Sequence, residues 1–171
     1  QINEWSDIMA KDSSFDVVSQ VDMQEMDNAV NQTKKEIAQR YDFRGSDASI
    51  ELEEKCIKLA AEDEYKLNAI IDMLRARMAK RDIPLRCLEL GKVEPASKGT
   101  VRQTLNILQG IPKEKAKAIV AAIKAMKLKV TAQMQDDQVR VSGAKKDELQ
   151  AVIQMLKAGD FGVDLQFINM R

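Results

Sequence analysis

The segments LNAIIDML (residues 67–74) and LQAVIQML (residues 149–156) are two versions of one sequence, offset by 82 positions. Five of the eight residues are identical, and the other pairs are similar in character. The match continues upstream without a gap, where ASIELEEKCIKLA (48–60) aligns with VTAQMQDDQVRVS (130–142). Self-similarity at a fixed offset is typical of a repeated structural unit. The sequence therefore predicts an internal duplication.

Both copies change from a strand period to a helical period at the same place. Residues 48–60 and 130–142 alternate apolar and polar side chains around a short charged turn, which predicts two β-hairpins. The segments that follow have apolar residues at helical spacing and predict helices over 67–78 and 149–156. An earlier helix is predicted after Asp22, which can cap it together with Glu25, and its counterpart starts at Pro112. The expected buried stripes of these two earlier helices are Met26, Val30, Thr33, Ile37 and Tyr41, and Ala116, Ile119, Val120 and Ile123.

Strand-like runs complete each copy. SFDVVSQV and TVRQTLNIL precede the earlier helices, and LRCLEL and VDLQFINM follow the later ones. The order βαββαβ, present twice, predicts an α+β protein of two ferredoxin-like units, each with two helices on one face of a four-stranded antiparallel sheet. We expect an N-terminal extension over 1–13 and units at 14–91 and 92–171, divided within GKVEPASKG. Met9 is a candidate initiator, which would leave residues 1–8 as vector or upstream sequence.

The composition argues against most classes of enzyme. The 171 residues contain no histidine, which excludes Ser-His-Asp and Cys-His catalysis and histidine-based metal sites. Cys56 and Cys87 lack the spacing of metal ligands or of a redox motif, so we expect ordinary core or strand residues. The sequence has no apolar run long enough to span a bilayer and no secretion signal. We expect a cytoplasmic protein that is not an enzyme and uses no metal or cofactor.

A net charge of zero conceals an uneven distribution of charges. Residues 1–64 hold 7 Lys/Arg and 16 Asp/Glu, whereas residues 98–171 hold 13 and 7. Between Lys98 and Lys129 there are eight basic residues and one acid. Such a field favours polyanions such as RNA, although the polar face of any soluble helix is the plainer interpretation. The candidate polyanion-binding residues are Lys113, Lys117, Lys124, Lys127 and Lys129.

The predicted plan leaves one face of each sheet uncovered. In the second copy this face carries Arg140 and Ser142, and Arg140 is equivalent to Lys58 of the first copy. Neither face has the paired aromatic residues with which an RNA-recognition motif stacks bases. The face either binds a nucleotide, with Arg140 and Ser142 as candidates, or packs against another sheet or subunit. Both interpretations stay open.

RYDFRG (residues 40–45) is dense in rings and arginines for a chain with 4% aromatic residues. As a helix end, it offers Gly45 as a left-handed residue and Arg44 near the negative end of the helix. As a binding loop, it offers the ring of Phe43 or Tyr41, the planar fork of Arg40 or Arg44 for phosphate or guanine edges, and Asp42 as an acceptor for guanine. Local physics favours the helix end. Asp42, Phe43 and Arg44 are nevertheless the candidate nucleotide-binding residues.

Four motifs carry a resemblance to a known family. SFDVVSQVD, RYDFRG, DQVRVSGAKKDELQ and LQFINMR resemble the bacterial YajQ family, from about Ser14 to Arg171. The resemblance implies a duplicated ferredoxin-like fold whose first strands, 15–21 and 101–108, are exchanged between the copies. It also implies binding of nucleotides, with cyclic di-GMP or GTP as candidates, and of RNA, with effects on transcription through a partner protein. It assigns no catalytic residues.

The leading hypothesis is a non-enzymatic cytosolic regulator that binds a nucleotide, with cyclic di-GMP as the most concrete ligand. One alternative is an RNA-binding protein that uses the five candidate lysines and would show steep salt dependence. Another is an adaptor that recruits a transcription regulator through its sheet faces or edges. No membrane partner is expected.

Overall fold

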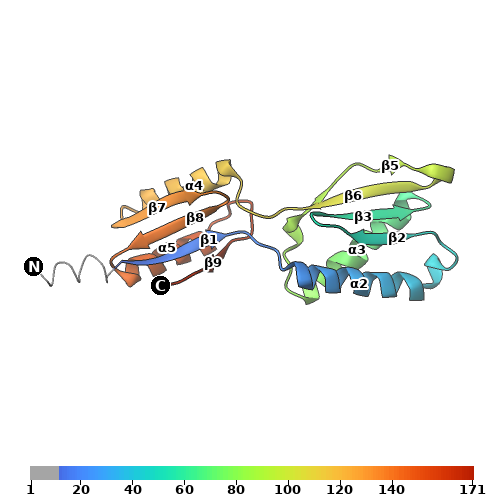
Figure 1. The fold of residues 1–171 in the computed structure, drawn as a ribbon, viewed down its shortest axis with the longest axis horizontal. Coiled ribbons are helices and arrows are strands. Elements are labelled where there is room, and N and C mark those ends of the chain that lie inside the picture. Colours follow the sequence, from blue (N-terminus) through green and yellow to red (C-terminus); the bar gives the residue numbers. More distant parts are fainter. Residues whose placement is uncertain (1–11) are drawn as a thin grey trace, which may run out of the picture. The chain divides into compact units, whose positions relative to one another are not determined.

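The computed structural model describes residues 12–171, so the expectation for Met9 and residues 1–8 lies outside the described part of the chain. The described chain is mixed α/β, with four α-helices and two antiparallel sheets (Figure 1), which agrees with the α+β class. It divides into two compact units. The central unit is Val21–Gln109, and the terminal unit joins the described residues up to Gln20 to Gly110–Arg171.

The central unit packs two long helices against one face of its sheet. The strand order is β2-β3-β6-β4, and the short β5 also pairs with β6. The buried cluster joins Met26 and Val30 of α2, Ile70 and Leu74 of α3, and inward strand residues such as Leu59. The elements are α2 (Met23–Gln39), η1 (Tyr41–Phe43), β2 (Ser49–Leu52), β3 (Cys56–Ala61), α3 (Glu64–Lys80), η2 (Leu85–Cys87), β4 (Leu88–Leu90), β5 (Glu94–Pro95), η3 (Ser97–Gly99) and β6 (Val101–Ile107).

The terminal unit repeats the plan of two helices on a four-stranded sheet. Its strand order is β7-β8-β1-β9, and its core joins Ile119 and Ile123 of α4 to Val152 of α5 and to Val139 and Val141 of the sheet. In Figure 1, α4 lies over β7 at one edge of this sheet. The elements are β1 (Ser13–Val18), α4 (Lys113–Ala125), β7 (Val130–Gln135), β8 (Gln138–Gly143), α5 (Lys146–Ala158) and β9 (Gln166–Ile168).

The inner strand β1 is distant in the sequence from the rest of its sheet, whereas the inner strand β6 follows soon after its neighbours β4 and β5. β1 pairs antiparallel with β8, with Asp16 opposite Arg140, and on its other side with β9. β6 pairs antiparallel with β3, with Thr104 opposite Lys58, and on its other side with β4. Both are inner strands with neighbours on two sides, so each sheet requires this strand for its continuity.

The helix starts follow the capping signals in the sequence, with two differences. The carboxylate of Asp22 accepts from the backbone N–H groups of Gln24 and Glu25 at 3.1 Å each, which confirms Asp22 as the cap of α2. The Glu25 carboxylate, predicted to complete the capping pair, instead accepts from Asn28 and Arg81. Pro112 is the N-cap of α4 and not its first helical residue as predicted, because its ψ of 149° is outside the helical range. The apolar stripes are confirmed in both units, apart from Tyr41.

Candidate functional site

The segment RYDFRG leaves the helix before its first aromatic residue. α2 ends at Gln39, and Arg40 adopts extended angles before the 3₁₀ turn of Tyr41–Phe43. The prediction that Tyr41 continues the buried stripe is wrong: its side chain is 83% exposed, whereas Phe43 is 4% exposed. The helical phase is lost at Arg40, so the spacing that places Ile37 against the core no longer applies to Tyr41. Gly45 has a φ of +73° and takes the left-handed conformation expected of it.

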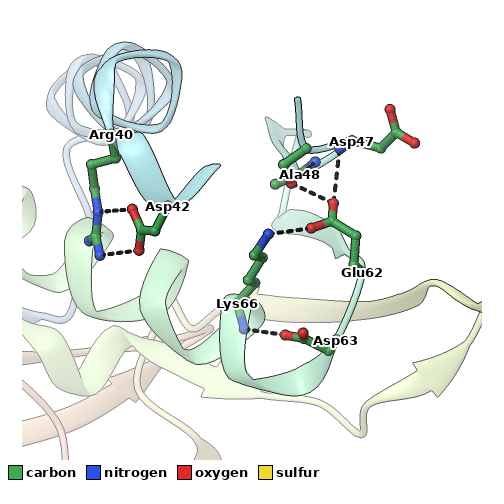
Figure 2. A network of polar contacts seen from close by, with 8 residues as sticks. Arg40, Asp42, Asp47, Ala48, Glu62, Asp63 and Lys66 are labelled. Atoms are coloured by element: carbon green, nitrogen blue, oxygen red, sulfur yellow. Dashed lines mark hydrogen bonds and ion pairs between the residues drawn. The ribbon is translucent and has the colours of Figure 1, made fainter. Parts of the chain in front are cut away.

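Arg40 and Asp42 neutralise each other. Arg40 Nε donates to Asp42 Oδ1 at 3.0 Å, and Arg40 Nη2 donates to Asp42 Oδ2 at 2.7 Å (Figure 2). This bidentate pair lowers the pKa of Asp42 below its usual value and raises the pKa of Arg40. Both carboxylate oxygens of Asp42 are therefore occupied, and reading a guanine with them would require breaking the pair.

Phe43 forms a platform below two cations. The Arg40 guanidinium lies 5.5 Å from the centroid of the Phe43 ring, and Lys66 Nζ of α3 lies 5.6 Å from it. The ring also borders a groove of ≈300 Å³ between α2 and the start of β2, lined by Ile37, Ala38 and Ser46 among others. Because Phe43 is almost fully buried, its main role is to hold the start of α3 against the end of α2.

A carboxylate network fixes the following loop to α3. Glu62 accepts from Lys66 Nζ at 2.7 Å, from the backbone N–H of Asp47 at 2.9 Å, and from the Ser46 hydroxyl (Figure 2). The Lys66 and Ser46 hydrogen bonds lower the pKa of Glu62, and Glu62 raises the pKa of Lys66. The Lys66 backbone N–H in turn donates to Asp63, the N-cap of α3. Lys66, like Arg40, is thus already paired.

Two exposed tyrosines and an arginine without an ion pair to a described residue neighbour this network in the sequence. Tyr41 is 83% exposed and Tyr65, in the first turn of α3, is 78% exposed. The Arg44 guanidinium lies 5.4 Å from the centroid of the Tyr41 ring and forms no ion pair with a described residue. Tyr41 adjoins Arg40 and Tyr65 adjoins Lys66, the two cations that contact Phe43. We call Tyr41, Arg44 and Tyr65 the tyrosine surface.

Arg140 and Ser142 belong to the terminal unit, so the two predicted groups of nucleotide-binding residues lie in different compact units. They alternate on β8 with buried residues, as expected for the open face of the sheet. Arg140 donates to Asp16 from Nε at 2.8 Å and from Nη2 at 3.2 Å. Asn169 Nδ2 donates to the same carboxylate at 2.7 Å, and Asp16 is 1% exposed. Arg140 therefore satisfies a buried carboxylate and has only part of its guanidinium available to a ligand.

The five candidate lysines are all exposed. Lys113, Lys117 and Lys124 lie on α4 at spacings of four and seven residues, which places them along one side of the helix. Lys127 and Lys129 follow in the turn before β7, where Lys127 has a left-handed φ of 56°. None of the five forms an ion pair with any residue between 12 and 171, in contrast to Arg40 and Lys66.

Comparison with known proteins assigns the chain to a family. Residues 13–171 match the family described as "Nucleotide-binding protein YajQ-like". The chain belongs to this YajQ-like family. A relative from Syntrophotalea carbinolica is 60% identical over 158 residues, covering 92% of this chain and 98% of the relative. A relative from Carboxydothermus hydrogenoformans is 55% identical over 165 residues, covering 95% of this chain and the whole relative, and both are named "Nucleotide-binding protein".

Sequence reasoning missed Tyr65, Lys66 and Glu62 at this site. All three lie between β3 and the apolar stripe of α3, where the pattern predicts only a helix start. Their proximity to RYDFRG depends on the packing of α2 against α3, in which Arg81 after α3 pairs with Glu25 at the start of α2, and Lys66 at the start of α3 contacts Phe43 after α2. The available signal was that Tyr65 is one of only two tyrosines in the chain and lies outside the stripe that begins at Leu67.

Two kinds of feature are absent from the part of the chain that the structure describes. Within residues 12–171, no three Cys, Asp or Glu side chains are arranged to hold a metal ion. No helix in the same range is long and apolar enough to cross a membrane.

Proposed function

We propose that the chain is a non-enzymatic nucleotide-binding regulator, and that the tyrosine surface of the central unit binds the nucleotide. The base stacks on an exposed tyrosine ring and Arg44 contacts a phosphate. Asp42 and Phe43 support this surface from below. Cyclic di-GMP is the leading candidate ligand, GTP is the second, and the cytoplasm is the proposed location. The related proteins are named for nucleotide binding, which supports the class of ligand.

The state of Arg44 is the observation that carries this proposal. Of the three cations around Phe43 and Tyr41, Arg40 and Lys66 are each paired with a carboxylate at 2.7 Å. Arg44 is exposed, lacks such a partner among the described residues, and lies over an exposed ring. A guanidinium held over an aromatic face can accept an anionic group without losing an existing salt bridge. Arg44 is therefore the cation of this group to which a phosphate can bind without breaking an existing ion pair.

Isothermal titration with cyclic di-GMP, GTP and a short structured RNA tests the proposal. Arg44→Ala should weaken nucleotide affinity by one to two orders of magnitude, because a charge-assisted contact contributes roughly 1.5–3 kcal/mol. Arg102→Ala is the matched control, since Arg102 is an exposed arginine of the same unit that pairs with Glu94 on the open sheet face. Equal affinities of wild type and a folded Arg44→Ala variant would refute the assignment.

Polyanion binding through α4 is a second candidate function, favoured by the five unpaired lysines. Replacing Lys113, Lys117 and Lys124 by Ala should lower RNA affinity and flatten its salt dependence, by about 0.7–0.9 in the logarithmic slope for each phosphate that is no longer neutralised. Lys34→Ala serves as the control, because Lys34 pairs with Glu51 at 3.1 Å. An unchanged slope in the triple variant would remove this candidate.

We also propose that the chain arose by duplication of one ferredoxin-like unit, with copies over 14–91 and 92–171 whose first strands were exchanged. The support is the repeat at an offset of 82, together with the pairing of β1 with β8 and β9 and of β6 with β3 and β4. A circular permutation of the central unit alone, with Gln109 joined to Val21 so that 101–108 directly precedes α2, tests the exchange. We expect this variant to fold with native thermal stability in its central unit, and a molten product would count against the idea.

A further inference from the structure

β7 is an edge strand of the terminal unit and pairs on one side only. Its neighbour is β8, in a register that runs from Val130 opposite Gly143 to Gln135 opposite Gln138. No strand within residues 12–171 pairs with its other side. Edge strands present a row of unpaired N–H and C=O groups that can pair with another chain. Such an edge is either protected by its side chains or suited to a partner.

The hairpin geometry identifies the free backbone groups. The two-residue turn of Asp136 and Asp137 makes Gln135 and Gln138 a hydrogen-bonded pair. Hydrogen-bonded and non-hydrogen-bonded pairs alternate along an antiparallel ladder, so Gln133 and Thr131 also direct their backbone groups toward β8. The N–H and C=O groups of Val130, Ala132 and Met134 consequently point away from the sheet, toward the open edge.

The strand carries none of the features that usually protect an edge. VTAQMQ contains no charged residue, no proline and no glycine over its full six residues. Its side chains alternate cleanly: Val130 and Ala132 pack against the core, while Thr131 and Gln133 are exposed on the open face. Met134 continues the apolar side but is 42% exposed. An uncharged strand with a partly exposed methionine favours pairing with another strand.

The residues that flank β7 show which partner fits. Lys127 and Lys129 precede the strand, and Asp136 and Asp137 follow it, all four with exposed side chains. When two copies of such a strand lie antiparallel about Ala132, Lys127 of each comes level with Asp137 of the other, and Lys129 lies diagonal to the same aspartate. A parallel arrangement would instead place lysine beside lysine. The charge pattern is therefore self-complementary in one orientation only.

We propose that β7 pairs antiparallel with β7 of a second copy of this chain, with the two-fold axis at Ala132. In this register the three outward residues are all used: Ala132 pairs with Ala132, and Val130 of each copy pairs with Met134 of the other. Met134 then packs on Val130 at the helix side of the sheet and loses its exposure. The two four-stranded sheets become one continuous sheet. The proposal is independent of the nucleotide site, because no residue of the tyrosine surface takes part.

Cysteine trapping tests the register. In a Cys56→Ser background, Ala132→Cys should form a disulfide-linked dimer, because a hydrogen-bonded antiparallel pair places the Cα atoms about 5.5 Å apart, within disulfide range. Gln133→Cys is the matched control on the adjacent residue. Its two copies would lie diagonally, at about 7–8 Å, and should link poorly. Preferential linking of Gln133→Cys would overturn the proposed register.

Sedimentation velocity of the full chain tests the association itself. Wild type should show a concentration-dependent dimer at concentrations on the order of 100 μM, as expected for a small interface. Ala132→Pro should weaken dimerisation about tenfold or more, because it removes from each copy an N–H group that points toward the partner strand. The substitution should leave the fold intact, because this N–H group makes no hydrogen bond to β8. Ala132→Ser, which keeps the N–H, should dimerise like wild type. A monomeric wild type that fails to link through Ala132→Cys, or a dimer unaffected by Ala132→Pro in a chain of normal melting temperature, would overturn the proposal.

Discussion

Replacing Asp16 by Asn should destabilise the terminal unit although the shape of the side chain is kept. The Asp16 carboxylate is 1% exposed and accepts hydrogen bonds from Arg140 at 2.8 and 3.2 Å and from Asn169 at 2.7 Å. Asparagine removes the charge and turns one acceptor into a donor, so one of these N–H groups loses its partner. Hydrogen bonds to charged groups contribute roughly 1.5–3 kcal/mol. Because the side chain of Arg140 is 40% exposed and can regain water, we expect a loss of about 2 kcal/mol.

The effect should depend on pH in a defined direction. The hydrogen bond from Arg140 is the main cause that holds the pKa of Asp16 below its usual value. A carboxyl whose folded pKa lies below its unfolded pKa gives its full stabilisation above the unfolded value, near 3.9, and loses it as the pH falls through the folded value. The stability difference between wild type and Asp16→Asn should therefore be complete at pH 7 and shrink below about pH 4.

Thermal unfolding followed by circular dichroism measures both effects. At pH 7 we expect the loss of about 2 kcal/mol to lower the melting temperature of the terminal unit by roughly 8–16 °C. Asp42→Asn is the matched control, because Asp42 also makes a bidentate pair with an arginine but is exposed. Its melting temperature should stay within about 2 °C of wild type. Equal shifts for the two variants, or a difference for Asp16→Asn that does not shrink at all between pH 7 and pH 2.5, would refute the reasoning.

Two further predictions concern stability and are checked by denaturant unfolding. Phe43→Ala should cost roughly 3–5 kcal/mol because it empties a buried site below two cations, whereas Tyr41→Ala should change stability by less than about 0.5 kcal/mol; similar costs would contradict the different exposures of the two rings. Gly110→Ala should cost about 1–2 kcal/mol, since Gly110 has a φ of +84° and a Cβ there would lie 2.6 Å from Asp137 Oδ2. Adding Asp137→Gly should recover part of this loss, and strict additivity of the two changes would show that the contact is unimportant.

The regular part of the fold was predictable because it depends on short-range periodicity. A helix requires apolar residues at a spacing of three and four, and a hairpin strand requires apolar and polar residues in alternation. Residues 67–78 follow the first pattern and residues 138–143 the second without interruption. Tyr41 was predicted wrongly because the helical phase ends at Arg40, and the spacing alone does not show where a helix stops. The boundaries of elements are set by caps and tertiary contacts, which the stripes do not encode.

The polar contacts were harder to predict from the sequence, because they join residues that are far apart in it. Asp16 and Arg140 are separated by 124 positions, and nothing local to either residue indicates a buried ion pair. A signal did exist: Asp16 is the only charge in SSFDVV, and Arg140 is the only charge in QVRVSG. Two lone charges of opposite sign in otherwise uncharged strands suggest a cross-strand pair once the strands are known to be neighbours. The sequence alone supplies the charges but not their adjacency.

The structure divides the hexapeptide RYDFRG into a part that is held by internal contacts and a part that is exposed. Arg40 is hydrogen-bonded to Asp42 and also lies over the Phe43 ring, so replacing Arg40 removes two contacts of the turn at once. Tyr41 and Arg44 contact mainly each other at the surface. A loss of nucleotide binding in Arg40→Ala would therefore be ambiguous, because the turn itself changes. The same loss in Arg44→Ala, with stability unchanged, would isolate the role of the one cation in the segment that no described carboxylate neutralises.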